Sequence, residues 1–297
     1  MKVLITGVSG LVGQALSAKL DADGHQPVAL RRSQVIGDPE APMWEPIRRR
    51  AWDSEVGYVD AVVHLAGENL AAHRWTPAFK RRIRDSRIVG TTQLCRHLAT
   101  LNRRPRVLIA ASAIGYYGDR GDEILTEHSS AGDGFLAQVC RDWEAACRPA
   151  LDAGIRVVNL RFGMILSRDG SGLAKVLPLF KLGLGARLGT GRQWMSWITL
   201  DDAVAVITRV ITDSALTGPV NAVAPNPVTN REYTHTLAAV LKRPAVLAVP
   251  AFALRLAMGE MADNMLLSSA RVVPQRLTEI AHSFRHPDIN TALMRII

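Results

Sequence analysis

The first twenty residues contain the pattern that most restricts the fold of this chain. An apolar run, Met1-Lys-Val-Leu-Ile-Thr6, is followed at once by Gly7-Val-Ser-Gly10-Leu-Val-Gly13, and helical spacing begins in Gln14-Ala-Leu-Ser-Ala-Lys-Leu20. A buried strand, a glycine turn and a helix N-terminus in this order are typical of a site for a dinucleotide pyrophosphate. The unpaired N–H groups and the positive end of the helix dipole then face the anion.

The glycines of this turn have separate roles in such a site. Gly7 allows the tight turn, Gly10 lets the backbone approach the phosphates, and Gly13 lets the helix pack closely on the strand. We therefore expect a dinucleotide to be contacted by Gly7, Ser9, Gly10, Leu11, Val12 and Gly13. A glycine turn in an α/β protein that binds no ligand is the alternative.

Apolar runs and helical patterns alternate through the first half of the chain. Strands are predicted at 2–6, 26–31, 60–66, 106–112 and 156–161. Helices are predicted at 11–23, 76–100 and 134–153. This alternation predicts right-handed crossovers and a doubly wound parallel sheet, which is a Rossmann-type α/β fold.

Beyond residue 163 the order loosens, and glycines between 170 and 191 surround one short helix. A helix at 200–212, a strand at 220–224, a helix at 231–242 and a mainly helical C-terminal segment from Pro250 follow. We interpret residues 1–163 as the dinucleotide-binding core, to which a strand and a helix return from about 200–242. Residues 164–199 and 243–297 would form a smaller lobe on the substrate side.

Composition excludes several classes of protein. The net charge of +9 comes from dispersed arginines without interleaved aromatic residues, so we expect no nucleic-acid partner. No apolar run reaches the roughly 18 residues of a membrane span, so no membrane partner is expected. Three cysteines without a CxxC spacing suit a reducing compartment, and the chain starts directly in a core strand, which predicts a cytoplasmic protein. The eight histidines are scattered, and no metal site is predicted.

The end of the second strand bears on the choice of dinucleotide. An NAD enzyme usually has Asp or Glu there to accept hydrogen bonds from the ribose 2′-OH. This chain has Arg31 and Arg32 and no acid, and a guanidinium binds a 2′-phosphate in bidentate fashion. We therefore expect NADP(H) to be preferred over NAD(H).

Further motifs follow the later strands. They are Thr6-Gly-Val-Ser-Gly-Leu-Val-Gly13, His64-Leu-Ala-Gly67, Ser112-Ala-Ile-Gly-Tyr-Tyr-Gly118, Asn159-Leu-Arg161 and Trp197-Ile-Thr-Leu-Asp-Asp202. Together they resemble the extended short-chain dehydrogenase/reductase superfamily, which contains nucleotide-sugar epimerases and dehydratases. The resemblance implies further cofactor contacts at Leu65, Ala66, Gly67 and Phe162, and a homodimer formed through the two long helices.

A narrower resemblance is to the atypical branch known only as epimerase family proteins. The segments that carry it are His64-Leu-Ala-Gly-Glu-Asn69, Phe135-Leu-Ala, Trp143-Glu-Ala-Ala146, Phe180-Lys-Leu-Gly-Leu-Gly185, Gly189-Thr-Gly-Arg-Gln-Trp194 and Leu266-Leu-Ser-Ser-Ala-Arg-Val-Val-Pro-Gln275. The likeness covers nearly the whole chain.

The catalytic residues of the superfamily are mostly missing. Its mechanism uses a tyrosine, a lysine four residues later, a serine and an asparagine. The matching positions here hold Leu136, Cys140, Ser112 and Arg87, so only the serine survives. A leucine transfers no proton, and the standard mechanism therefore cannot operate.

Tyr116, Tyr117, Cys140 or water would supply the proton in place of the missing acid, and Ser112 would orient a carbonyl or hydroxyl of the substrate. The tyrosines would otherwise pack under a substrate loop. Cys140 near the cationic Arg87 would have a lowered pKa, or it would be a small core residue.

Other polar and aromatic residues are expected around the ligands. Arg87 would bind the cofactor ribose or phosphate, because a charge in the cleft needs an anion. The substrate side would be lined by Glu68, Arg161, Arg192, Gln193, Trp194 and Trp197. Glu68 would otherwise cap the next segment, and the tryptophans would otherwise anchor the second lobe.

The sequence thus predicts an NADP(H)-binding oxidoreductase or epimerase-like enzyme acting on a small molecule. The alternative is a non-catalytic NADP(H)-binding sensor or scaffold protein, which the loss of the tyrosine–lysine pair would allow.

Overall fold

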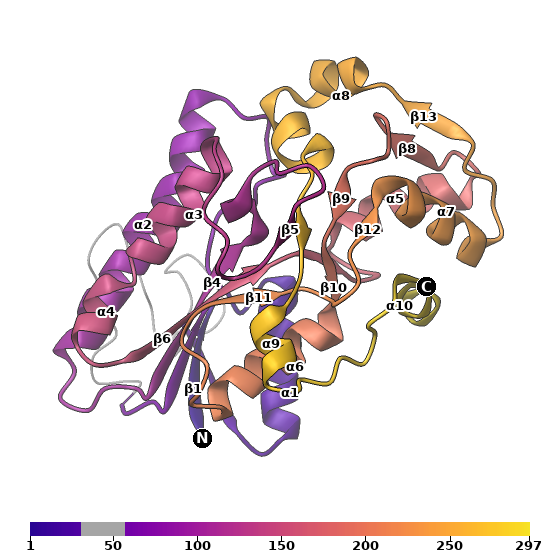
Figure 1. Cartoon of the computed structure of the whole chain (residues 1–297). Coiled ribbons are helices and arrows are strands. Elements are labelled where there is room, and N and C mark those ends of the chain that lie inside the picture. Colours follow the sequence, from indigo (N-terminus) through magenta and orange to yellow (C-terminus); the bar gives the residue numbers. More distant parts are fainter. Residues whose placement is uncertain (31–56) are drawn as a thin grey trace.

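A parallel β-sheet forms the centre of the molecule in the computed structural model, which describes residues 1–30 and 57–297 (Figure 1). Within these residues its six strands lie in the order β11-β6-β4-β3-β1-β2. Their bounds are β1 Lys2–Thr6, β2 Gln26–Leu30, β3 Ala61–His64, β4 Val107–Ala113, β6 Arg156–Phe162 and β11 Gly218–Ala222. From β1 the chain adds β2 on one side and then crosses back to add β3 on the other side, so the strand order switches between β1 and β3. Ligands of such parallel sheets bind at the carboxyl ends of the strands beside this switch point. The predicted Rossmann-type fold is confirmed.

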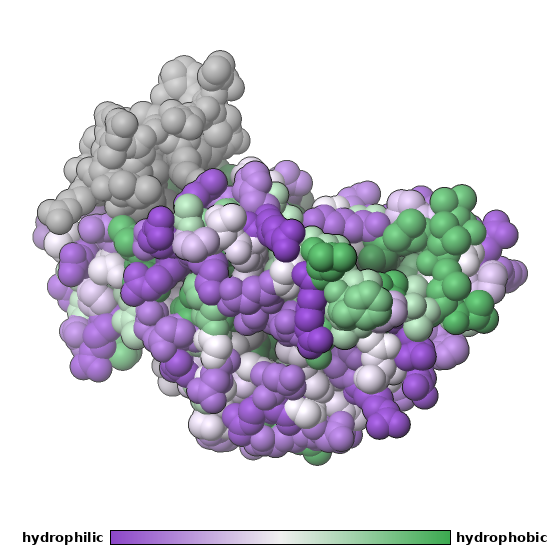
Figure 2. Space-filling view, turned by 90° about the horizontal axis from the view of Figure 1, so that it is seen from above, coloured by the Kyte–Doolittle hydropathy of each residue, from purple (hydrophilic) through white to green (hydrophobic). Residues whose placement is uncertain are grey.

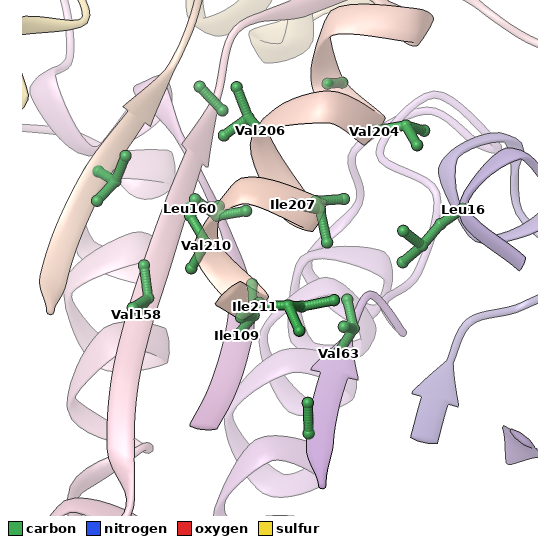
Figure 3. Packing of buried hydrophobic residues seen from close by; sticks show 14 of the residues in the cluster. Leu16, Val63, Ile109, Val158, Leu160, Val204, Val206, Ile207, Val210 and Ile211 are labelled. Carbon is green, nitrogen blue, oxygen red and sulfur yellow. The ribbon is translucent and has the colours of Figure 1, made fainter. Parts of the chain in front are cut away.

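One face of the sheet is covered by α1 (Leu11–Ala22) and α6 (Leu200–Thr212). Val3 and Ile5 of β1 point to this side, and they pack with side chains from both helices. Figure 3 shows Leu16 of α1 and Ile207 of α6 in the same cluster. Leu4 between them belongs to the cluster on the opposite side. This alternation is the period of two expected for a strand that is buried on both faces.

The opposite face is covered by α2 (Pro77–Thr100), α3 (Phe135–Ala145) and α4 (Arg148–Asp152) (Figure 1). The prediction of one continuous helix over 134–153 is wrong, since the helix ends at Ala145 and restarts at Arg148. Pro149 explains the break, because it has no N–H for the hydrogen bond of a continuing helix and instead occupies the first turn of α4.

The smaller lobe has its own core. α5 (Gly172–Lys181), α7 (Asn230–Leu241) and α10 (Ile289–Ile296) pack around Trp197. The sequence placed the helix at 231–242 with the sheet, whereas α7 packs in this lobe. Short strands complete the lobe and its junction with the sheet: β5 Ile124–Leu125, β7 Met164–Leu166, β8 Ala186–Leu188, β9 Trp194–Met195, β10 Trp197–Thr199, β12 Val228–Thr229, β13 Leu247–Val249 and β14 Arg271–Val272.

The C-terminal segment is mainly helical, as predicted. It contains α8 (Ala251–Met258), a π-helix over Ala262–Leu267, α9 (Gln275–Glu279) and α10. Leu277 of α9 joins the core cluster beside α6, so the segment returns to the sheet before it ends in the lobe. Within the described residues, no helix combines the length and apolar character needed to cross a bilayer.

Candidate cofactor and substrate site

The loop between β1 and α1 has the geometry that its glycines predict. Gly7 adopts φ +72°, and its carbonyl accepts a hydrogen bond from Gly10 N at 3.0 Å. A Cβ atom at Gly13 would lie 2.7 Å from Val8 Cα and closer still to the Gly7 carbonyl oxygen. The helix can therefore pack this closely on the loop only because residue 13 has no side chain. Gly10 is the N-cap and supplies no side-chain cap, which leaves the helix N-terminus at Leu11 and Val12 open to an anion. These features fit a dinucleotide pyrophosphate.

The segment that follows β3 forms a wall beside this loop. A Cβ atom at Gly7 would lie 2.8 Å from the carbonyl carbon of Leu65, which shows how closely the two backbones approach. Ala66 N donates to Thr6 Oγ1 at 3.2 Å and ties the wall to β1. The predicted cofactor residues Leu65, Ala66 and Gly67 therefore lie next to the glycine loop.

Below this wall, His64 is fully buried in a polar chain. Its Nδ1 lies 2.7 Å from Thr6 Oγ1, and its Nε2 lies 2.9 Å from Thr91 Oγ1. Trp143 Nε1 donates to the same Thr91 oxygen at 2.9 Å. Burial lowers the pKa of His64 to about 4, so the ring is neutral at physiological pH. His64 is therefore a core histidine at the end of β3.

Arg87 lies on α2 behind Gly67. Its Nη1 and Nη2 donate to the carbonyl oxygens of Ile83 and Glu68 at 3.2 and 3.1 Å. Its guanidinium carbon lies 5.0 Å from the ring centroid of Trp143. Burial lowers the pKa of Arg87, and the neighbouring Cys140 and Glu68 act in the opposite direction. The cation is therefore placed beside the expected cofactor wall, where contact with a ligand stays a prediction.

Ser112, the surviving serine, is tied to a buried ion pair. Ser112 Oγ donates to Glu144 Oε1 at 2.7 Å. Arg161 binds the same carboxylate in bidentate fashion, with Nε–Oε1 and Nη2–Oε2 distances of 2.8 Å each. The Arg161 side chain is only 3% exposed and that of Glu144 13%. Burial alone would lower the pKa of Arg161, but the hydrogen bonds and charge of Glu144 outweigh it and raise that pKa.

The two tyrosines next to this pair differ in their surroundings. Tyr117 is fully buried; its hydroxyl donates to Asn221 Oδ1 at 2.7 Å and accepts from Arg161 Nη1 at 2.9 Å. Burial raises the pKa of Tyr117 to about 12. The Tyr116 ring is half-buried beneath the Arg161 guanidinium, 3.4 Å from its carbon, and its hydroxyl has no hydrogen-bond partner in the described part of the chain. Tyr117 therefore acts as a structural link, while Tyr116 retains a free hydroxyl.

The face of α3 that turns toward Ser112 carries Leu136, Cys140 and Glu144, each one turn apart. A Cβ atom at Gly115 would lie 3.4 Å from Leu136 Cβ and 3.9 Å from Cys140 Sγ. The expected lowering of the Cys140 pKa is wrong. Burial raises that pKa to about 11, helped by the charge of Glu144, and this outweighs the effect of Arg87.

The remaining predicted residues are more scattered. Glu68 lies at the wall, where its Oε1 accepts from the exposed Arg82 at 3.2 Å. Phe162 ends β6 and packs against the core cluster. Arg192 is exposed in the lobe. Arg31 and Arg32 lie outside the described residues.

Three of the predicted substrate-side residues have hydrogen-bond partners within the protein. Gln193 is buried and donates to the carbonyl oxygens of Leu188 and Leu266. Trp194 donates from Nε1 to Asp122 Oδ1 at 2.7 Å. Trp197 is fully buried, and its Nε1 donates to the Asn226 carbonyl oxygen at 3.1 Å. Full burial and this hydrogen bond favour the alternative that Trp197 anchors the second lobe.

Glu144 is the main residue that the sequence interpretation missed. Its position in the Trp143-Glu144 motif was visible, but no role was assigned to it. The spacing of eight residues from Leu136 and four from Cys140 was the available signal, because residues one turn apart share a helix face. Asn221 and Glu127 extend the same network and carried no sequence signal: Glu127 Oε1 accepts from Asn221 N at 2.9 Å.

Comparison with known proteins agrees with this geometry. The family model described as NAD dependent epimerase/dehydratase family matches residues 3–223, and a domain of unknown function, DUF1731, matches residues 249–296. An epimerase family protein of Mycobacterium bovis is 45% identical over 98% of this chain and 96% of its own length. A chloroplastic SDR39U1 homolog of Arabidopsis thaliana is 36% identical over 100% of this chain and 87% of its own length.

A solved structure is also similar along its whole length. The crystal structure of human epimerase family protein SDR39U1 with NADPH superposes with a TM-score of 0.92. It is 30% identical, and the alignment covers 100% of this chain and 99% of the human chain. An NAD(P)-binding fold of the epimerase type is therefore shared by the two proteins.

Proposed function

Since the chain belongs to the NAD dependent epimerase/dehydratase family, we propose that it is an NADP(H)-dependent oxidoreductase or epimerase-like enzyme acting on a small hydroxyl compound. The observation that carries this proposal is that the glycine loop after β1 and Ser112 near the end of β4 lie at the same carboxyl edge of the sheet, with β3 between the two strands. Gly7, Gly10 and Gly13 leave room for a pyrophosphate. Ser112, two strands away on β4, is held in one orientation by its hydrogen bond to Glu144.

The residues that would hold the cofactor come from three segments. The open N-terminus of α1 would bind the pyrophosphate, and the backbone of Leu65, Ala66 and Gly67 would lie along the adjoining ribose. Arg31 and Arg32, which directly follow β2 in the sequence, support a preference for NADP(H) over NAD(H), as does the NADPH in the human relative. A bound nicotinamide supplies hydride chemistry.

The direction of the Ser112 hydrogen bond determines what the serine offers to a substrate. Its proton is donated to Glu144, so the Oγ lone pairs remain as acceptors. An acceptor at this point binds a substrate hydroxyl and is unsuited to polarise a carbonyl oxygen. We therefore infer that the substrate is bound as an alcohol, with its O–H directed at Ser112 Oγ.

The surroundings of each candidate residue indicate which group exchanges the proton of the substrate hydroxyl. Tyr117 and Cys140 are buried, and burial raises the pKa of both, to about 12 and about 11. Tyr116 has a half-exposed ring and a hydroxyl without a partner among the described residues. Tyr116 or a water molecule is therefore the proposed proton carrier.

A non-catalytic NADP(H)-binding sensor or scaffold is the second candidate function. The observation that favours it is the hydrocarbon and thiol on α3, because Leu136 and Cys140 stand where the superfamily has its tyrosine and lysine. In this case the chain binds the cofactor without turnover.

Spectroscopy separates the two functions. NADP+ with the purified chain and a panel of alcohols should give the absorbance of reduced nicotinamide, and Ser112→Ala should abolish it while leaving the affinity for NADP+ unchanged. Affinity without turnover across the panel would favour the sensor. If neither NADP(H) nor NAD(H) binds in a fluorescence titration, both functions are refuted.

A double substitution tests the choice of cofactor. Arg31→Ala with Arg32→Ala should weaken NADPH binding by roughly 10- to 100-fold, because charge-assisted hydrogen bonds contribute about 1.5–3 kcal/mol each. NADH affinity should stay the same. Unchanged NADPH affinity would remove the assignment.

We also propose that the chain works in the cytoplasm. All three cysteines are buried and unpaired, which suits a reducing compartment.

A further inference from the structure

The smaller lobe presents an apolar surface that no part of the described chain covers. It consists of Leu182, Leu184, Val246, Leu247, Phe252 and Leu256, and is called the apolar patch below. The residues are contiguous, since β13 pairs with β8 and brings Leu247 opposite Ala186, two residues after Leu184. α8 begins two residues after β13 ends. Figure 2 shows hydrophobic residues gathered at the right of the view, over α8 and β13.

The side chains of the apolar patch stand out from the surface. Val246 is 87% exposed, Leu256 77%, Leu182 73% and Phe252 71%. Leu254, on the opposite side of α8, is buried and anchors the helix to the protein. Such a large exposed apolar area on a soluble domain indicates an interaction site. Protruding apolar side chains can insert into a lipid bilayer. A groove that binds a protein segment is instead concave and shields its apolar residues.

The two segments that build the patch carry only positive charges. Residues 170–200 contain Lys175, Lys181, Arg187 and Arg192 and no Asp or Glu. Residues 233–259 contain Lys242, Arg243 and Arg255 and again no Asp or Glu, and of these cations Arg255 pairs with Asp263 at 2.9 Å. Lys181, Lys242 and Arg243 are exposed next to the apolar residues in the chain. A second copy of this chain would bring like charges together at this face, which opposes self-association through it.

From these observations we propose that the apolar patch and its cations bind the surface of an anionic lipid bilayer. Phe252, Leu256 and Val246 would enter the boundary between headgroups and acyl chains, and Lys181, Lys242 and Arg243 would contact the phosphates. This attachment requires no spanning helix. It therefore revises the expectation of no membrane partner, which rested only on the absence of a long apolar run.

Vesicle sedimentation tests this inference with the full chain. The protein should bind vesicles of phosphatidylcholine with phosphatidylglycerol, and bind vesicles of phosphatidylcholine alone at least tenfold more weakly. Phe252→Ser with Leu256→Ser should weaken binding to the anionic vesicles by at least about tenfold, because both side chains lose apolar burial. Lys181→Glu with Lys242→Glu should have a similar effect that high salt mimics.

Leu151→Ser is the matched control, because Leu151 is a half-exposed leucine on α4, far along the chain from the patch, and should leave binding unchanged. Circular dichroism and NADPH affinity report whether each variant is folded. No sedimentation of the wild type with anionic vesicles would overturn the inference, as would binding that survives both double substitutions. The inference would also be overturned if the wild type binds no vesicles and is a dimer in analytical ultracentrifugation, while the Phe252/Leu256 variant is a monomer. That result would assign the face to a second copy of the chain.

Discussion

Removing the charge of Glu144 should destabilise the fold strongly. Glu144→Gln leaves the guanidinium of Arg161, whose side chain is 3% exposed, without its counter-charge and replaces one acceptor oxygen by an NH2 group, which only donates. Two hydrogen bonds of 2.8 Å from Arg161 and one of 2.7 Å from Ser112 depend on the carboxylate. Breaking one partner of a buried ion pair costs about 3–5 kcal/mol, and we expect a loss of this size in the free energy of unfolding.

The assay is urea denaturation followed by circular dichroism, with Glu123→Gln as the matched control. Glu123 also binds an arginine in bidentate fashion, since Arg120 donates to its two oxygens at 2.8 and 2.7 Å, but this pair lies at the surface. Exposed pairs contribute about 0–1 kcal/mol, so the control should lose no more than that. If the two substitutions destabilise the protein equally, burial does not make the Glu144–Arg161 pair special and the reasoning is refuted.

Three further predictions concern the loop, the buried histidine and the C-terminal segment. Gly13→Ala should reduce NADPH affinity at least about tenfold, since its Cβ would lie 2.7 Å from a backbone atom of the loop, whereas Gly172→Ala, with no atom within 4 Å, should bind normally in a titration. Because burial lowers the pKa of His64 from 6.5 to about 4, only the unfolded state gains a proton in this range. The free energy of unfolding should therefore fall by roughly 3 kcal/mol as the pH drops from about 6.5 to about 4, and a His64→Asn variant that keeps this slope would contradict the assignment. Asp202→Ala should expose the C-terminal segment to limited proteolysis, because the buried carboxylate accepts from Arg285 N and His286 N at 2.7 and 3.0 Å; Asp201→Ala, at an exposed position, should show the wild-type pattern.

The central sheet was predictable because local patterns determine it. The apolar runs of β1 and β3 are buried on both faces, and such runs bounded by helical spacing have few other solutions. The glycine loop was predictable for the same reason, since Gly7 needs φ +72° and Gly13 needs the absence of a side chain. Both requirements act over a few residues and are therefore visible in the sequence.

The details of the candidate site depended on contacts between distant segments. Ser112 and Glu144 lie 32 residues apart, and Tyr117 and Asn221 lie 104 apart, so no local pattern indicates either hydrogen bond. The direction of the Cys140 pKa was predicted from one neighbouring charge, whereas burial decides it. Sequence shows which charges are near along a helix, but the exclusion of water requires the packed structure.

The same helix face explains how this site differs from that of its superfamily. α3 keeps the spacing of four residues, but the reactive pair at the first two positions has become Leu136 and Cys140, and the ionised group has moved one turn further to Glu144. There Arg161 binds the carboxylate with two hydrogen bonds, and Ser112 donates its proton to the same group. Ser112 is therefore held in one orientation by its hydrogen bond to Glu144. A site of this kind can bind and orient a hydroxyl, and the proton itself must be exchanged by Tyr116 or water. Turnover that depends on Tyr116 would thus mark an enzyme, and binding that depends only on Ser112 and the glycine loop would mark a sensor.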